Sequence, residues 1–437
     1  MICRNKYRCQ SYVNEQRFTS VFLRRFVRNI PLTQNTLKVV ASHEQTVEHK
    51  LTGDSHYHPT ASAQSCEELY WNWTVPGGNL DTRIRYVKAG TQGPPLLLIH
   101  GFGVGYYHFE RNIPELSKSC QVYALDLLGQ GCSWPNRKPT VEDALYMSVD
   151  VWVMQIRDFM QQVMQVGKHN ATEDEGQGKC GASYIAGNSL GGLLAVYMAA
   201  MYPERVRGLV LLNATPFWSF RPPLRSQAQG LWAALPKGFG SVPVPEGLKA
   251  LIGGLWWDTL RQIQTVRSLL RLVYRESSTV DAATVERIIE ATGHPLALDV
   301  FSAITLAPQP DLNFDACLQR IKAPILMLYG RDDPWVVPLW GQRLKRKCPQ
   351  AVYLELSPAG HCPHHEVPRS VNWAISSWIS SGGQADPVHR DSPHVLQEND
   401  DREIFIVHRD GTPNSAPTNF LSNLIDVIEG VIKRQPT

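Results

Sequence analysis

The five residues Gly187-Asn188-Ser189-Leu190-Gly191 have the types and spacing of a serine nucleophile. They lie between an apolar run, Ser183 to Ala186, that is typical of a buried strand, and an apolar segment from Gly192 to about Met201 that predicts a helix. At such a sharp strand-to-helix turn the backbone is strained and bulkier side chains would collide, so glycines flank the serine. The hydroxyl group of Ser189 is therefore expected to protrude where a substrate can reach it.

Two residues later in the chain could activate this hydroxyl group. A buried strand predicted at 325–329 runs into two acidic residues, and a carboxylate at the end of a strand can orient an imidazole. Asp333, three residues past the glycine that ends this strand, is our candidate, and Asp332 is the weaker alternative. The alternating run 352–356 leads to His361, the candidate base. The order Ser189, Asp333, His361 is that of the α/β-hydrolase fold and not that of the other serine-hydrolase folds.

A glycine-rich turn upstream could stabilise the negative charge that develops when a serine attacks an ester. Leu96 to Ile99 reads as a buried parallel strand that runs straight into His100-Gly101-Phe102-Gly103. In this position a backbone N–H group can point at the oxyanion. The amides of Phe102 and of Leu190, the residue after the nucleophile, are our candidates for the oxyanion hole.

Other interpretations of these motifs are weaker. The spacing of Gly101, Gly103 and Gly105 suggests a dinucleotide-binding loop, but Tyr106 and His108 stand where the third glycine is needed. The run 361–365 contains three histidines and a cysteine, but it lacks a second Cys/His group at ligand spacing, so no metal and no cofactor are expected. A purely structural turn serine remains the simple alternative for Ser189, although four features in the expected order rarely coincide.

The elements that would position these residues alternate between strands and helices from about 66 to 381, as in a doubly wound sheet. Residues 122–126 and 209–213 are two further buried strands, and a helix between them is indicated by apolar residues at helical spacing, Trp152, Ile156, Phe159, Met160 and Val163. We therefore predict an α/β-hydrolase fold with a mostly parallel, doubly wound sheet.

The alternation stops between about 217 and 307. Because this insertion follows the strand predicted at 209–213 and precedes the strand before Asp333, we expect it to form a helical cap over Ser189. Its aromatic residues suit an apolar substrate, and candidate contacts are Phe217, Trp218, Trp256 and Trp257. For any single ring, packing within the cap itself is the simpler interpretation.

Composition limits the classes of protein to which the chain can belong. With 437 residues, 43% hydrophobic and 19% charged, and a net charge of +3, it can bury a large core and gives no nucleic-acid signal. The nine cysteines are odd in number and scattered, which is typical of reduced thiols in an intracellular compartment. No apolar run approaches the roughly 20 residues that span a bilayer, so we expect membrane contact, if any, to be peripheral.

The two ends of the chain differ from its middle. Up to Ser42 there are eight Lys or Arg residues against the single acid Glu15, which is typical of an organelle transit peptide, with a basic disordered arm as the alternative. We therefore divide the chain into a leader at 1–65, a hydrolase domain at 66–381 and a C-terminal extension at 382–437. Within this extension a polar stretch precedes a possible strand at 404–407. The role of the extension and the oligomeric state are not readable from the sequence.

From about 80 to 380, cap included, the chain resembles the pheophytinases, plastid hydrolases of plants and algae that remove the phytol tail of pheophytin. The resemblance is carried by seven runs, 101–105, 107–110, 125–131, 213–218, 293–295, 329–336 and 358–364. It implies a chloroplast enzyme of the stroma or thylakoid surface, a lipophilic pigment ester as substrate, and His294 as a further substrate contact. The chain departs from the family at His365, where an acidic residue is expected, and at His100, which replaces a usual proline.

The resemblance implies that Ser189 attacks the ester carbonyl that joins the macrocycle to phytol. His361 would take and return the proton while Asp333 fixes its tautomer, and water would then release pheophorbide. The same residues fit a chlorophyll dephytylase or another plastid hydrolase of lipophilic esters. A non-catalytic receptor with this fold is the alternative from a different class of protein.

Overall fold

The computed structural model describes residues 66–76, 80–137, 148–166, 181–215, 257–306, 312–390 and 392–412. The expected leader at 1–65, three of the candidate substrate contacts, Phe217, Trp218 and Trp256, and the last 25 residues, 413–437, lie outside these ranges.

The described strands form one ten-stranded sheet in the order β1-β2-β4-β3-β5-β6-β7-β8-β10-β9. They are β1 (Glu67–Thr74), β2 (Asp81–Ala89), β3 (Pro95–Ile99), β4 (Gln121–Leu125), β5 (Ser183–Asn188), β6 (Val206–Leu212), β7 (Ile325–Gly330), β8 (Val352–Ser357), β9 (His394–Asn399) and β10 (Arg402–His408). The central strands from β4 to β8 pair in parallel, and antiparallel strands flank them on both sides. The sheet is therefore mostly parallel, as predicted.

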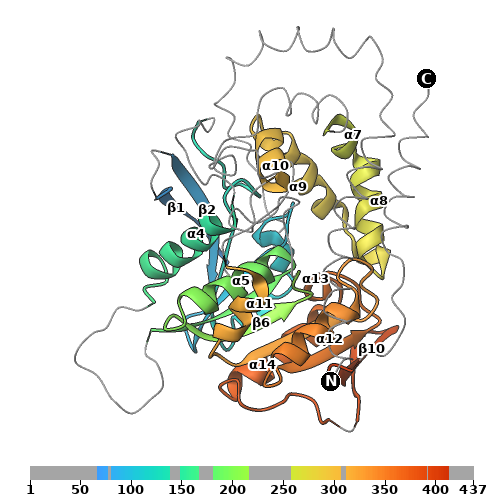
Figure 1. Ribbon diagram of the computed structural model, residues 1–437. Helices are drawn as coiled ribbons and strands as arrows, with labels where there is room; N and C mark the ends of the chain where they lie inside the picture. Colours follow the sequence, from blue (N-terminus) through green and yellow to red (C-terminus); the bar gives the residue numbers. More distant parts are fainter. Residues whose placement is uncertain are drawn as a thin grey trace, which may run out of the picture.

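Helices cover both faces of this sheet (Figure 1). The described helices are η1 (Tyr106–Phe109), α3 (Ile113–Leu116), α4 (Val149–Gln162), α5 (Leu190–Met201), α7 (Asp258–Leu260), α8 (Ile263–Val273), η4 (Ser277–Thr279), α9 (Ala282–Thr292), α10 (Ala297–Leu306), α11 (Phe314–Arg320), α12 (Pro338–Lys347), α13 (Pro363–Glu366) and α14 (Pro368–Ser380). The helix predicted from Trp152 to Val163 is α4, and the helix after Ser189, α5, begins two residues earlier than expected.

The two faces bury alternate residues of each central strand. Leu97 and Ile99 of β3 pack with α4 and α5, whereas Leu96 and Leu98 pack on the opposite face with α14. Because successive side chains of a strand point to opposite faces, a strand covered on both sides must be apolar throughout. This explains why the continuous apolar runs of the sequence are central strands and why helices pack on both faces of the sheet.

Helices α7 to α10 lie between β6 and β7 in the chain, within the segment where a cap is expected. Figure 1 shows them grouped together, apart from the helices that cover the sheet. The end of α8 contacts the sheet domain, where the backbone N–H group of His361 donates to the carbonyl oxygen of Val273 over 2.9 Å. The cap helices are thereby fixed at one end to the loop that carries the candidate base.

The sheet continues beyond β8, because β10, which contains the possible strand at 404–407, pairs antiparallel with β8 and with β9. Ile404 and Ile406 of β10 are fully buried in the same apolar cluster as α14. The boundary expected at 381 therefore divides one continuous sheet. A polar stretch that looks like a linker is here the connection to two strands that extend the sheet beyond β8.

Candidate active site

Ser189 lies at the turn between β5 and α5 in a strained backbone conformation, with φ +52° and ψ −113°. Such a positive φ is rare for a residue with a side chain and is found where the surrounding structure enforces it. The flanking glycines are required by close approach. A Cβ atom on Gly187 would lie 2.3 Å from the backbone of Gly191, and one on Gly191 would lie 2.1 Å from the carbonyl oxygen of Ile99. The structure thus gives the physical reason for the G-x-S-x-G spacing.

Backbone hydrogen bonds fasten this turn to the end of the neighbouring strand. The N–H group of Ser189 donates to the carbonyl oxygen of Leu212 over 3.0 Å, and its own carbonyl oxygen accepts from Thr215 over 3.2 Å. The strain at Ser189 is therefore held by β6 as well as by α5.

His361 and Asp333 form a buried hydrogen bond, with 2.7 Å between Nδ1 of the imidazole and Oδ2 of the carboxylate. Both side chains are shielded from solvent, with exposures of 6% and 2%. An imidazole held through Nδ1 presents Nε2 on its other side, which is the nitrogen that a triad histidine uses as a base. Asp332, the weaker alternative, instead lies 3.8 Å from the guanidinium group of Arg275.

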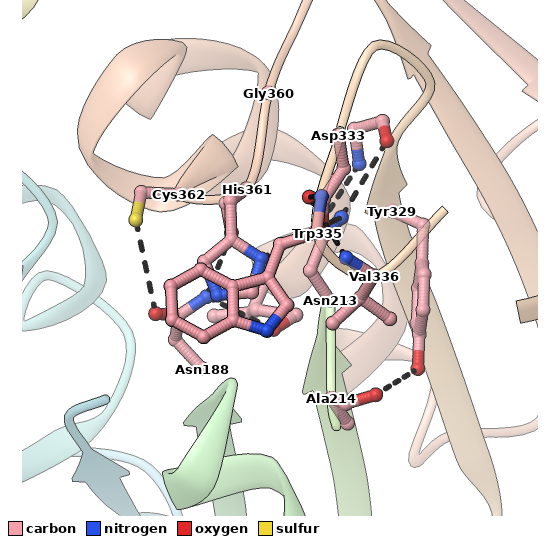
Figure 2. A network of polar contacts seen from close by, with 12 residues as sticks. Asn188, Asn213, Ala214, Tyr329, Asp333, Trp335, Val336, Gly360, His361 and Cys362 are labelled. Carbon is pink, nitrogen blue, oxygen red and sulfur yellow. Dashed lines mark hydrogen bonds and ion pairs between the residues drawn. The ribbon is translucent and has the colours of Figure 1, made fainter. Parts of the chain in front are cut away.

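Three further hydrogen bonds orient the Asp333 carboxylate (Figure 2). Oδ1 accepts from the backbone N–H groups of Trp335 and Val336, and Oδ2 accepts from the side-chain amide of Asn213 over 2.6 Å. The Asn213 side chain also accepts from the N–H group of Gly330 over 2.9 Å. The carboxylate is thus fixed between the ends of β6 and β7 by contacts that do not involve the imidazole.

Asn188 ties the serine turn to the histidine loop. Its buried side-chain amide donates to the carbonyl oxygens of Leu212 and of His361, each over 3.0 Å. The residue before the candidate nucleophile is therefore in direct contact with the backbone of the candidate base, although 173 positions separate them in the chain. Cys362 also contacts Asn188, but burial raises the pKa of its thiol, which disfavours the reactive thiolate.

The candidate oxyanion donors lie on two elements that converge on this turn. Leu190 is the first residue of α5, where backbone N–H groups have no acceptor within the helix. Phe102 follows β3, whose end is in close contact with the start of α5 at Gly191. His100, between them, is structural, because its Nε2 accepts from Leu127 over 2.9 Å and its Nδ1 contacts the Gly101 carbonyl oxygen.

The cap candidates that the structure describes meet the sheet domain through aromatic contacts. Trp257 packs against Phe301 of α10 with 5.2 Å between ring centroids, and Phe301 in turn packs against Phe102 with 6.1 Å. His294 stacks on Trp134 with 4.1 Å between centroids. The ring of Phe301 thereby connects Trp257 to the candidate oxyanion turn. His294 instead contacts Trp134, in the loop after β4.

A cluster of buried histidines lies behind the histidine loop. His108 is hydrogen-bonded to Tyr274 over 2.8 Å and to His364 over 3.1 Å, and Tyr274 is hydrogen-bonded to His365 over 3.2 Å. Burial lowers the pKa of all three histidines, and together with the Arg111 guanidinium it lowers the pKa of His365 to about 2. These rings are therefore neutral at physiological pH and act as packing and hydrogen-bonding groups.

Glu366, one residue beyond this cluster, joins the histidine loop to the cap. Its buried carboxylate accepts from the backbone N–H groups of Gly360 and of Glu276, the latter over 2.7 Å. Sequence reasoning missed Glu366, Asn188 and Asn213 as site residues. For Asn213 a signal existed, since it follows a buried parallel strand at the edge where Asp333 was expected.

Within the described ranges, no three His, Cys, Asp or Glu residues are grouped so that they could hold a metal ion. Among the same residues, no helix combines the length and apolar character needed to cross a membrane.

Comparisons with known proteins agree with this geometry. Residues 96–372 match the Alpha/beta hydrolase family. "Pheophytinase, chloroplastic" of Arabidopsis thaliana is 37% identical over 351 residues, which cover 72% of this chain and 69% of that protein. A 2-hydroxy-6-oxononadienedioate/2-hydroxy-6-oxononatrienedioate hydrolase of Burkholderia vietnamiensis is 27% identical, with 69% and 90% covered. A thermophilic esterase from Thermogutta terrifontis shares the fold, with a TM-score of 0.51, 19% identity, and 72% and 99% covered.

Proposed function

The chain belongs to the alpha/beta hydrolase family, and from this premise we propose that it cleaves the phytyl ester of pheophytin with Ser189 as nucleophile. It is a carboxylic-ester hydrolase. The choice of substrate is supported by the relative from Arabidopsis thaliana, which is named a pheophytinase and is 37% identical. The products would be pheophorbide and phytol.

The observation that carries the mechanism is the 2.7 Å hydrogen bond between His361 Nδ1 and Asp333 Oδ2. It fixes the imidazole in the orientation that leaves Nε2 to receive a proton. Asn188 supports the assignment of Ser189, because its side chain holds the His361 backbone beside the serine turn. The strained conformation of Ser189 supports it further, since such strain persists at functional turns.

In the proposed reaction, His361 removes the hydroxyl proton of Ser189 while the serine oxygen attacks the ester carbonyl carbon. The N–H groups of Phe102 and Leu190 bind the oxyanion, and each contributes about 3–4 kcal/mol to transition-state stabilisation. When the tetrahedral intermediate collapses, the C–O bond to phytol breaks and His361 returns the proton to the departing oxygen. Water, deprotonated by the same imidazole, then releases the acid from Ser189.

An apolar cap favours such a substrate energetically. Burial is worth about 0.8 kcal/mol per CH₂ group, so shielding half of a twenty-carbon tail contributes several kcal/mol before ordering costs. The rings of Trp257, Phe301 and Phe102 give an aromatic path from α7 to the proposed oxyanion turn. The basic segment up to Ser42 and the chloroplast protein among the relatives support a chloroplast location, with the thylakoid surface as the source of the pigment.

The full chain incubated with pheophytin, chlorophyll and a short-chain ester tests this function, with products separated by chromatography. We expect pheophorbide from pheophytin and little release of phytol from chlorophyll. Comparable cleavage of chlorophyll would assign a dephytylase instead, and absence of hydrolysis of every ester would assign a receptor.

The matched variant is Ser189→Ala, which removes only the hydroxyl oxygen. Loss of a serine nucleophile lowers kcat by up to about 10⁶-fold, so activity on pheophytin should fall below detection while the thermal unfolding midpoint changes little. Activity near that of the wild type would exclude Ser189 as nucleophile.

A further inference from the structure

Trp335 is a large apolar side chain that remains exposed beside the proposed catalytic base. Its exposure is 43%, whereas His361 is 6% and Asp333 2% exposed. The indole stacks on the imidazole of His361, with 5.8 Å between ring centroids and 19° between planes. Figure 2 shows the indole lying across the imidazole. One part of the ring thus covers His361, and solvent reaches another part.

The backbone from which this indole projects is held by hydrogen bonds to the Asp333 carboxylate. The N–H group of Trp335 donates to Asp333 Oδ1 over 2.7 Å, and that of Val336 donates to the same oxygen over 3.0 Å. Val336 itself is buried in the core. The turn that holds the Asp333 carboxylate therefore also fixes the backbone that carries the indole.

The chemistry of the proposed reaction gives the two sides of the site different roles. The histidine of a triad returns its proton to the oxygen of the departing alcohol, so the alcohol half of the ester must lie next to His361. The oxyanion donors bind the carbonyl oxygen, and the rings linked to Phe102 lie near that turn. A group stacked on His361 is therefore on the side of the alcohol.

We propose that Trp335 is a specificity-determining residue that contacts the alcohol half of the ester and favours long apolar alcohols. This inference rests on the proposed function for the assignment of Ser189 and His361, but not on the identity of the acid. The flat face of a partly exposed indole offers an extended apolar surface to a branched hydrocarbon chain, and its single N–H group lies at the edge of the ring. A short alcohol does not extend far enough from His361 to contact the outer part of the ring.

The experiment compares esters that share one acid and differ in their alcohol. We use the phytyl and methyl esters of the pheophorbide propionate, and hexadecyl and ethyl butyrate as a pair without pigment, all with the full chain in matched detergent. In Trp335→Ala, kcat/KM for the long-chain esters should fall at least about tenfold more than for the short-chain esters. Trp335→Phe, which keeps an aromatic face, should recover most of this loss.

Tyr70→Ala is the matched control, because Tyr70 is a 42% exposed aromatic residue on β1, at the opposite end of the sheet. The Tyr70→Ala variant should leave the ratio of kcat/KM for long-chain and short-chain esters unchanged in both ester pairs. Inhibition by free hexadecanol provides a second readout, and its inhibition constant should rise about tenfold in Trp335→Ala. Equal losses for long and short esters, or no loss at all, would overturn the inference. Failure of the wild type to cleave pheophytin while it cleaves the butyrates would overturn the proposed substrate but not the role of Trp335.

Discussion

Asn213 shows at the scale of single residues how the candidate acid is held. Its backbone has φ +43°, and its side chain donates to Asp333 Oδ2 and accepts from Gly330 N–H. Asparagine tolerates a positive φ better than most residues and supplies both a donor and an acceptor. One side chain therefore satisfies the conformation of the turn and aligns the carboxylate with His361.

Replacement of Asn213 by alanine should lower kcat by about ten- to a hundredfold, because a small displacement of a catalytic group has an effect of that size. KM should change less, since Asn213 is buried away from substrate. Asn213→Gly separates the two roles of the residue. It should lose as much activity as Asn213→Ala but unfold at a higher temperature, because glycine adopts a positive φ without strain. Wild-type kcat in either variant would contradict the positioning role.

The sequence predicted the serine, the acid and the base because each follows an apolar strand at a recognisable turn. Asn188 lies within the recognised motif, yet its contact with His361 spans 173 positions and leaves no local pattern. The Asn213 side chain likewise reaches Asp333 only because β6 and β7 are neighbours in the sheet. The local sequence does not specify that pairing. Motif spacing reports local geometry, whereas these supporting side chains depend on tertiary structure.

At the scale of elements, α13 meets two parts of the fold that are distant from it in the chain. The histidine cluster joins η1, the segment after α8, and α13 through hydrogen bonds between His108, Tyr274, His364 and His365. All four side chains are largely shielded from water, and none of the histidines has an acidic partner in these bonds. Neutral imidazoles can share such a space, but charged imidazoles would repel one another and lose their solvation.

The free energy of unfolding should therefore fall as the pH drops below about 6.5. Below that pH the unfolded chain protonates these histidines, while the native state, with lowered pKa values, does not. Each such histidine contributes a slope of about 1.4 kcal/mol per pH unit, and His365 keeps contributing down to its pKa of about 2.

Urea unfolding of the wild type and of His365→Gln at pH 7.5, 6.0 and 5.0 measures this contribution. The variant removes one titrating group without adding charge. Its free energy of unfolding should therefore fall less steeply with decreasing pH, by the slope of about 1.4 kcal/mol per pH unit that corresponds to one proton. Parallel curves for the two proteins would show that His365 is protonated in the native state. His365 is also a departure from the resemblance noted in the sequence, and its burial among uncharged rings explains how a histidine is accommodated there.

At the scale of the whole molecule, β9 and β10 join residues 394–408 to the sheet of the hydrolase domain. Glu398 of β9 accepts from the N–H groups of Arg369 and Ser370 at the start of α14, and Arg409 pairs with Glu355 of β8. The sequence indicated a possible strand at 404–407 but neither its place in the sheet nor β9, for a physical reason. Polar, turn-rich residues precede these strands, and outer strands with one exposed face lack the continuous apolar runs that identified the centre of the sheet.

If these strands belong to the same cooperative unit, Ile406→Ala should destabilise the entire domain by about 2–5 kcal/mol, since Ile406 is fully buried. The matched control is Val395→Thr on β9, an exposed position where a β-branched residue is retained, with an effect within about 0.5 kcal/mol. Urea unfolding followed by tryptophan fluorescence and by loss of esterase activity should give coincident transitions. An early transition that leaves activity intact would place β9 and β10 in a separate unit.

The guanidinium group of Arg402 on β10 donates to the carbonyl oxygens of Pro358 and Glu366, over 2.8 and 3.1 Å, and so spans the loop on which His361 lies. Translation produces Ser189, Asp333 and His361 before it produces this arginine. A nascent polypeptide that has reached residue 390 contains every proposed catalytic side chain but not the brace that immobilises the imidazole loop. The proposed hydrolysis is thereby expected to depend on a side chain that lies far beyond the last of the three catalytic residues in the chain.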